Sequence, residues 1–190
     1  MRIITGSARG RQLSTPKGEE TRPTADLVKQ GLFSAIQFRV PGRRVLDLFA
    51  GSGQLGLEAL SRGASYAVFC DSSEPAIACI RKNAAACNLS EQTRVCRGEA
   101  FSVLENLART EKDPFSLIFL DPPYSKGLCE KAMQRLCALQ LVSPYAICVC
   151  ESDAGDELPA QAGAFSLVRS LRYGRRMLHI YETGGEFAHE

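Results

Sequence analysis

The sequence lacks several features that would indicate a secreted or membrane-bound protein. It opens with MRIITGSARG, without the long apolar run of a signal peptide, and no apolar stretch approaches the roughly 20 residues of a membrane-spanning helix. No two cysteines have the CxxC spacing, which argues against a zinc ribbon or a thioredoxin-type centre. We therefore expect a cytoplasmic protein with no metal site and no membrane attachment.

The eight cysteines also fail to form the pattern of a disulfide framework. Cys79 and Cys87 fall within helical patterns, whereas Cys148 and Cys150 lie in the strand-like run AICVCES. Free cysteine behaves as a small apolar residue, and disulfides are rare in reducing compartments. Most of these cysteines are predicted to be core residues.

The net charge is low, +2 with a pI near 8.1, so nothing in the overall balance demands a nucleic-acid partner. The basic residues are nevertheless unevenly distributed. The segments 1–18 and 158–181 contain basic residues and no acidic ones. Each segment is compatible with an RNA-binding surface or with an ordinary solvated face.

The middle of the chain alternates between two periodicities, which is typical of an α/β protein. Short, largely apolar runs read as strands at 45–50, 65–71, 93–98, 115–121 and 146–152. Helical patterns separate them at 54–63, 74–88, 100–109 and 128–139. This alternation predicts β-α-β units and a parallel sheet with helices on both faces.

The two ends of the chain read differently. Residues 1–20 are predicted to form a small β-hairpin extension, and residues 21–40 a leading helix. Two strand-like runs joined at Gly174, 165–173 and 175–183, predict an antiparallel hairpin. We expect a mostly parallel seven-stranded sheet in a single domain over 1–183, with its Rossmann-like core at 44–183 and a frayed tail at 184–190.

Carboxylates stand at the ends of four consecutive predicted strands: Asp47, Asp71, Glu99 and Asp121. Any one of these acids could be a helix cap. In an open parallel sheet, however, ligands bind outside the carboxyl ends of the strands, near the switch in strand order. The four acids together therefore predict a ligand site at that edge.

The stretch GSGQLG at 51–56 leaves two ligands open. It matches the dinucleotide fingerprint, with Asp71 at about the spacing that holds a ribose, which would suit a nicotinamide-dependent dehydrogenase. Asp47, just before the glycines, disfavours that reading because its charge would repel a pyrophosphate. A ligand with an amino-acid end, a ribose and an adenine fits better, and S-adenosylmethionine is such a ligand.

The stretch IFLDPPYSKG at 118–127 places Asp121 and Tyr124 on a support stiffened by two prolines. An exocyclic amine of a nucleobase is a poor nucleophile, because its lone pair is conjugated into the ring. The Asp121 carboxylate and the Pro122 carbonyl could accept its N–H groups, while Tyr124 could stack on the base. A plain Pro-Pro turn after a buried strand is the competing interpretation.

In its DLFAGSG and DPPY motifs, the chain resembles the methyltransferases that modify exocyclic nitrogens of nucleobases. The segments MRIITGSARGRQL, TRPTADLVKQGLFSAI and YGRRMLHIYE are similar to one family in particular, over nearly the whole chain. This is the bacterial 16S ribosomal RNA (guanine-N2)-methyltransferase family. DPPY alone is shared with DNA adenine methyltransferases.

The resemblance implies a class I, Rossmann-like methyltransferase fold and S-adenosylmethionine-dependent transfer to the N2 of one guanine in 16S ribosomal RNA. It implies Asp121, Pro122 and Tyr124 as the catalytic loop. The cofactor residues that it implies are Asp47, Phe49, Ala50, Gly51, Gly53, Asp71, Glu99, Ala100 and Asp121. Arg22 and Thr24 match its RPT segment and would lie near the site.

RNA binding is assigned to Arg9, Arg11, Arg22, Thr24 and Arg172 as candidates for phosphate or substrate contacts. The low net charge suggests weak binding to naked RNA, so the substrate is expected to be a partly assembled small ribosomal subunit, bound by a monomer. Two alternatives stay open: a DNA adenine-N6 methyltransferase, and a non-catalytic cofactor- or RNA-binding module.

Overall fold

The computed structural model describes residues 1–16, 23–122 and 127–185. Its strands and helices alternate along the chain, as the sequence predicts. The strands are β1 (Arg44–Asp47), β2 (Tyr66–Asp71), β3 (Thr93–Arg97), β4 (Phe115–Leu120), β5 (Val142–Asp153), β6 (Gln161–Ala162), β7 (Phe165–Tyr173) and β8 (Arg176–Thr183). The helices are α1 (Pro23–Ile36), η1 (Gln37–Arg39), α2 (Gln54–Ser61), α3 (Glu74–Ala86), η2 (Ser90–Gln92), α4 (Ala100–Thr110) and α5 (Leu128–Ala138).

The strands form one eight-stranded sheet in the order β3-β2-β1-β4-β5-β8-β7-β6. Strands β1 to β5 pair in parallel, whereas β8 inserts antiparallel between β5 and β7. This confirms the mostly parallel sheet with an antiparallel carboxyl-terminal hairpin. The count differs from the predicted seven because the two-residue strand β6 also pairs with β7. So short a strand leaves no periodicity to read in the sequence.

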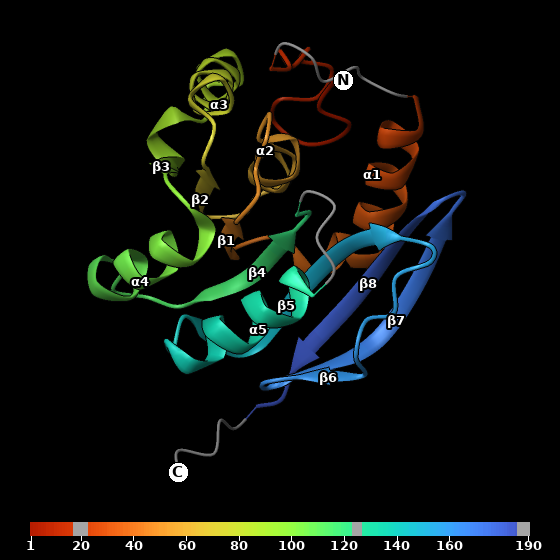
Figure 1. Ribbon diagram of the computed structural model, residues 1–190. Helices are drawn as coiled ribbons and strands as arrows, with labels where there is room; N and C mark the ends of the chain where they lie inside the picture. Colours follow the sequence, from red (N-terminus) through yellow and green to blue (C-terminus); the bar gives the residue numbers. More distant parts are fainter. Residues whose placement is uncertain (17–22, 123–126, 186–190) are drawn as a thin grey trace.

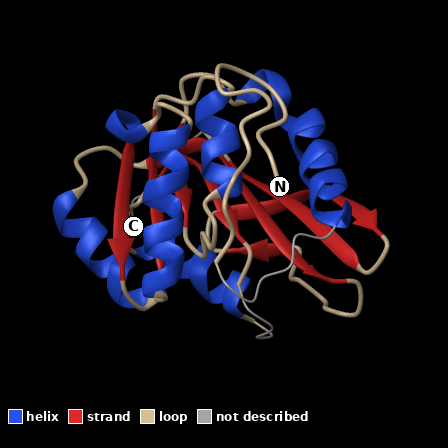
Figure 2. Ribbon diagram, turned by 90° about the horizontal axis from the view of Figure 1, so that it is seen from above, coloured by secondary structure: helices blue, strands red, loops and turns tan. Residues whose placement is uncertain are grey.

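Helices cover both faces of the sheet, with α1, α2 and α3 on one side and α4 and α5 on the other (Figure 1). Viewed from the side of the first group, these helices lie in front of the strands (Figure 2). Each face has its own apolar core. One includes Leu32, Leu57 and Ile80, and the other Leu104 and Met133. The strands are apolar on both sides because both sides are buried.

The amino-terminal segment folds back on itself as a short hairpin without regular strands. Arg2 and Gln12 form an isolated antiparallel bridge, and the amides of Ile3 and Leu13 donate to the carbonyl oxygens of Arg11 and Met1, both at 3.0 Å. The amides of Ile4 and Thr5 bind the carboxylate of Glu58 on α2. The segment is therefore a hairpin-like extension that is also fastened to α2.

The cysteines are mostly core residues, as predicted: six of the eight are buried. The two hydrophobic cores contain Cys87 on one face of the sheet, and Cys70, Cys129, Cys148 and Cys150 on the other. In the described ranges, none of the helices combines the length and the apolar composition that crossing a bilayer requires.

The strand order reverses between β1 and β4, which are neighbours in the sheet although two strands lie between them in sequence. At such a switch point the loops leave in opposite directions and open a crevice at the carboxyl ends of the strands. The loops after β1, β2, β3, β4 and β5 meet there.

Candidate functional site

A cavity of about 1340 Å³ lies at this edge of the sheet. Its wall brings together residues from the predicted site: Phe49, Ala50, Gly51, Asp71, Glu99, Ala100, Asp121 and Pro122. Two predicted cofactor residues, Asp47 at the end of β1 and Gly53 in the loop that follows, are absent from the wall. The cavity is large enough for a nucleotide-sized ligand together with part of a second substrate.

The first loop is shaped by its glycines. Gly53 precedes α2 with a φ of +78°, in the left-handed region that favours glycine. Gly56 lies so close to β2 that an added Cβ would stand 2.3 Å from Cε1 of Phe69. The glycines therefore let the loop turn sharply and let α2 pack directly on the sheet.

Asp47, the last residue of β1, is buried against the first turn of α2, with 3% of its surface exposed. Its Oδ2 accepts a hydrogen bond of 3.1 Å from the Gly56 amide. Burial, followed by the nearby charges of Asp121 and Asp71, raises the pKa of Asp47 to about 7. The Asp47 carboxyl group therefore binds an amide in the first turn of α2. In a dinucleotide-binding protein, the pyrophosphate would bind the amides at this position, so the contact weakens the dehydrogenase interpretation.

Asp71, at the end of β2, ties two loops together. Its Oδ2 accepts from the Gly51 amide and its Oδ1 from the Ser73 amide, both at 2.8 Å. A carboxylate oxygen has two acceptor positions, so each oxygen keeps capacity for a second donor. Asp71 can therefore fix the glycine loop and still bind hydroxyl groups in the cavity.

Glu99 caps α4. Its Oε2 accepts from the amides of Phe101 and Ser102 at 3.0 and 3.2 Å, while Ala100 begins the helix and is buried. The acid is thus a helix cap and also part of the cavity wall. For a strand-end acid, the sequence left open a role as a helix cap and a role in a ligand site. Glu99 is compatible with both roles.

Asp121 and Pro122 follow β4 and belong to the cavity wall. In the sheet, β4 lies on one side of β1, whereas β2 and β3, which carry the Asp71 and Glu99 loops, lie on the other. Strand β4 is buried through Leu120, and the chain leaves the sheet at Asp121. Tyr124, the third residue of the predicted catalytic loop, lies outside the described residues.

Glu151, which was not among the predicted site residues, belongs to the same wall. It stands on β5 beside Asp121, because Leu120 of β4 pairs with Cys150 of β5. Its Oε1 lies 3.2 Å from Nη1 of Arg176 on β8. Burial, and then the charge of Asp121, raise the pKa of Glu151 to about 7. The rule that picked out the other strand-end acids would have found it, had it been applied to the fifth strand.

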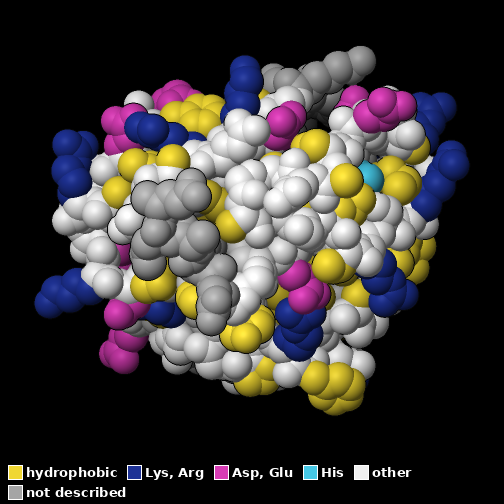
Figure 3. Space-filling view, turned by 90° about the horizontal axis from the view of Figure 1, so that it is seen from below, with side chains coloured by type: hydrophobic (Ala, Val, Ile, Leu, Met, Phe, Trp, Pro, Cys, Tyr) yellow, Lys and Arg dark blue, Asp and Glu magenta, His cyan; other side chains and the backbone are white. Residues whose placement is uncertain are grey.

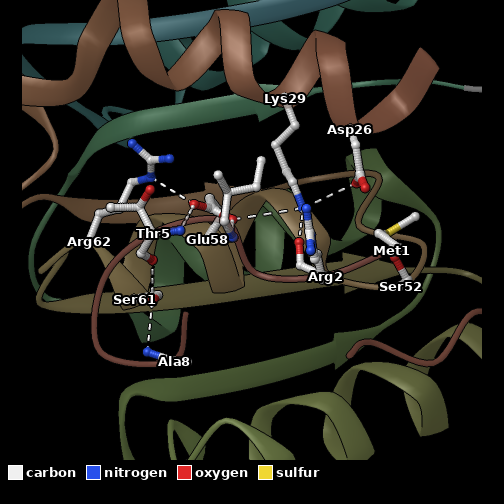
Figure 4. Close-up of polar contacts among 12 residues, drawn as sticks. Met1, Arg2, Thr5, Ala8, Asp26, Lys29, Ser52, Glu58, Ser61 and Arg62 are labelled. Carbon is white, nitrogen blue, oxygen red and sulfur yellow. Dashed lines mark hydrogen bonds and ion pairs between the residues drawn. The ribbon is translucent and has the colours of Figure 1, made fainter. Parts of the chain in front are cut away.

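Lys29 of α1 is a second residue that the sequence analysis missed. It lines the cavity, is 1% exposed, and donates a 2.6 Å hydrogen bond to the carbonyl oxygen of Arg2. Its Nζ lies 3.8 Å from Glu58 and 4.0 Å from Asp26 (Figure 4). Burial lowers the pKa of Lys29 while these two carboxylates raise it. Amphipathic spacing alone assigns Lys29 no role in the site.

The amino-terminal segment closes one side of the cavity, where Met1 and Thr15 are part of the wall. The Asn83 side chain fastens it to the glycine loop: its Nδ2 donates to the carbonyl oxygens of both Ser14 and Ser52 at 2.9 Å. The Ser52 hydroxyl also contacts the Met1 sulfur at 3.5 Å (Figure 4).

The predicted RNA-binding residues that the structure describes lie outside the cavity wall. Arg9, Arg11 and Arg172 are exposed and lie outside the cavity wall. Arg22 and the side chain of Thr24 lie outside the described residues. On the face seen in Figure 3, basic side chains are spread around the outline with acidic ones among them. Within the described ranges, no group of three or more metal-binding side chains is arranged to hold a metal ion.

Comparison with known proteins gives a consistent picture. The family model described as "Conserved hypothetical protein 95" matches residues 1–182. The chain is 38% identical to "Putative rRNA methyltransferase YlbH" of Bacillus subtilis, over 97% of this chain and 100% of that protein. It is 33% identical to "Ribosomal RNA small subunit methyltransferase D" of Escherichia coli, over 96% of this chain and 89% of that protein.

The structural comparison agrees with the sequence comparison. The solved structure titled "Putative methyltransferase yhhF from Escherichia coli" superposes with a TM-score of 0.84 at 33% identity, covering 98% of this chain and 99% of that one. The fold is therefore that of a Rossmann-like methyltransferase, and the chain belongs to the conserved hypothetical protein 95 family, which includes ribosomal RNA small subunit methyltransferase D.

Proposed function

We propose that the protein transfers a methyl group from S-adenosylmethionine to the N2 amine of one guanine in the 16S RNA of the small ribosomal subunit. One observation carries the proposal: Asp121 and Pro122 share a single cavity with the glycine loop, Asp71 and Glu99. The names of the relatives support ribosomal RNA as the substrate class.

The residues present fit the cofactor. Asp71 has acceptor capacity for the ribose hydroxyls, and Glu99 and Ala100 border the space for an adenine. The buried carboxyl group of Asp47 favours a cationic amino group at the glycine loop. Phe49, Ala50 and Gly51 supply the wall between these groups. When bound, S-adenosylmethionine supplies an electrophilic methyl carbon, and the electron pair of the broken carbon–sulfur bond stays on sulfur.

The protein's own contribution is to hold the amine and accept its proton. The Asp121 carboxylate and the Pro122 carbonyl accept N–H groups of N2, which directs the nitrogen lone pair out of the base plane. N2 becomes acidic only as the new N–C bond forms, so the carboxylate of Asp121 suffices as acceptor for the released proton. Tyr124 is assigned to stacking on the base.

The basic residues Arg9, Arg11, Arg22 and Arg172, together with Thr24, are assigned to the RNA. With a net charge of +2, the protein gains little from counterion release. A partly assembled subunit, which presents the target guanine in a fixed shape, is therefore the proposed substrate, and the enzyme acts on it as a monomer in the cytoplasm.

The test is methyl transfer from labelled S-adenosylmethionine to small subunits, protein-free 16S RNA and duplex DNA, all from a strain lacking the protein. We expect N2-methylguanosine in the digested subunit RNA and less label in protein-free RNA. Label in DNA as N6-methyladenine would contradict the proposal in favour of a DNA methyltransferase. No transfer to any substrate would favour a binding module.

A further inference from the structure

Two of the free cysteines lie side by side on neighbouring strands. Cys96 is on β3, the strand at one end of the sheet, and Cys70 is on β2 beside it (Figure 1). The two residues are register partners in this parallel pair. Cys70 belongs to the apolar core that contains Leu104 of α4, and Cys96 packs against that core. Both side chains are therefore on the same face of the sheet.

The spacing of the strands suits a bond between the two sulfur atoms. Neighbouring strands lie about 4.8 Å apart, which is also about the distance between the Cα atoms of register partners. A disulfide joins residues whose Cα atoms are roughly 4.4–6.8 Å apart. The two thiols already share a hydrogen bond. The pair thus lies within the range that a disulfide can bridge.

The two thiols differ in their access to solvent. Cys70 is fully buried, whereas Cys96 is half-buried on the outer strand. The hydrogen bond from the Cys70 thiol, helped by the guanidinium of Arg94, lowers the pKa of Cys96 to about 6, against the opposing effects of burial and of Glu111. Because the thiolate is the nucleophilic form of cysteine, Cys96 is the sulfur that would react with an oxidant.

We propose that Cys96 and Cys70 form an oxidation site, at which a hydroperoxide converts the two thiols into a disulfide. The Cys96 thiolate attacks a peroxide oxygen and the O–O bond breaks, which leaves a sulfenic acid on Cys96 and, from hydrogen peroxide, a hydroxide that is protonated to water. The Cys70 sulfur then displaces hydroxide from the Cys96 sulfur, and the Cys70 proton leaves with it as a second water. Both thiols are oxidised, and one peroxide is reduced.

The position of the pair relates it to the candidate functional site. Asp71 follows Cys70 directly, and only Arg97 and Gly98 separate Cys96 from Glu99. The Gly98 amide donates to the carbonyl oxygen of Asp71 at 3.0 Å. The disulfide would therefore join the ends of the two strands that lead to these acids.

The test treats the reduced, folded protein with excess hydrogen peroxide at neutral pH. Remaining thiols are then alkylated, and the peptides are mapped by mass spectrometry. We expect one linked pair of peptides, containing Cys70 and Cys96, and alkylation of the other six of the eight cysteines. A thiol reductant should restore the unlinked peptides. A link between other cysteines, or one that forms only in urea, would overturn the proposal.

Single variants test the order of the two steps. In Cys70→Ser, oxidation of Cys96 should stop at the sulfenic acid, which a 1,3-diketone reagent traps. In Cys96→Ser, Cys70 should stay reduced because it is buried. Oxidation of Cys70 at the wild-type rate in Cys96→Ser would contradict the assignment of Cys96 as the attacking sulfur.

The chain supplies matched controls for both exposure and proximity. Cys137 on α5 is also partly exposed, but burial raises the pKa of its thiol, so iodoacetamide should modify Cys96 at least about 10-fold faster. The Sγ atoms of Cys148 and Cys150 lie 4.0 Å apart, yet both residues are buried, so this pair should stay reduced. Equal reactivity of Cys96 and Cys137, or preferential linkage of Cys148 to Cys150, would overturn the proposal. The proposed function is tested separately, by methyl transfer.

Discussion

The acids at the ends of β1, β2 and β3 differ from those at the ends of β4 and β5 in what surrounds them. Asp47, Asp71 and Glu99 each accept hydrogen bonds from backbone amides of the loops and helices at the carboxyl ends of the strands. Glu151 instead pairs with a guanidinium and lies beside Asp121. The first group therefore shapes the loops, whereas Glu151 is held by a side chain of the carboxyl-terminal hairpin. Residues of one type at equivalent strand ends thus serve two purposes.

The largest effect is expected at the second group. Asp121→Ala should lower methyl transfer about 1,000-fold, because the reacting amine loses a preorganised acceptor. The affinity for S-adenosylhomocysteine, measured by calorimetry, should change by less than about threefold, since removing one contact to the amine leaves the glycine loop intact. Equal losses of affinity and of transfer would show that Asp121 belongs with the first group.

Asp47→Asn should separate burial from function. The pKa of Asp47 is raised to about 7 in the folded protein against an ordinary 3.8, so the folded state holds the proton more tightly. Its stabilising contribution is present below about pH 4 and is lost as pH rises through 7. Between pH 4 and pH 8, the free energy of unfolding of the ligand-free wild type should therefore fall by about 4 kcal/mol relative to that of the variant.

Thermal or urea unfolding at several pH values measures this shift. Saturating S-adenosylhomocysteine should reduce it, because a bound amino group would favour the ionised form of Asp47. A pH-independent difference between the variant and the wild type would mean that Asp47 is ionised at an ordinary pKa.

Asp71→Ala should affect both stability and ligand binding. The Gly51 and Ser73 amides would lose their acceptor, which should lower the free energy of unfolding by about 1–3 kcal/mol. The affinity for S-adenosylhomocysteine should fall about 10-fold or more, as the glycine loop loosens and the ribose loses its partner. Loss of stability without loss of affinity would make Asp71 purely structural.

The smallest effect is expected away from the cavity. Glu105→Gln removes the exposed ion pair in which Glu105 and Arg135 lie 2.6 Å apart, joining α4 to α5. Exposed pairs contribute little, so stability should change by less than about 1 kcal/mol and methyl transfer should stay at the wild-type level. A larger change would show that helix packing on this face also controls the strand-end acids.

The sequence allowed the alternating fold, the strand-end site and the family resemblance to be predicted because each depends on local patterns. Apolar runs mark β1 to β5, and glycines and prolines mark the loops that leave them. The position of Asp47 was predicted, but its bond to Gly56 was not. Whether the carboxyl group of an acid faces a ligand or the first turn of a helix depends on its side-chain rotamer. The spacing of residues in the sequence does not determine that rotamer.

The contacts that close the cavity could not be predicted in this way. Ile4 and Glu58 are 54 residues apart, and Ser14 and Asn83 are 69 apart. Neither pair leaves a periodic signal, and Lys29 reads as one polar position on a helix. The amino-terminal hairpin was predicted from turn residues, but the binding of its Ile4 and Thr5 amides to Glu58 of α2 was not.

The antiparallel direction of β8 has a consequence for synthesis of the protein. Because β8 runs against β5, its first residue, Arg176, returns to the edge where the parallel strands end. A nascent chain that had emerged only through β5 would already possess the glycine loop and every strand-end acid, including Glu151. It would lack Arg176, which pairs with Glu151, so this side of the cavity would be completed last, once the final hairpin had left the ribosome.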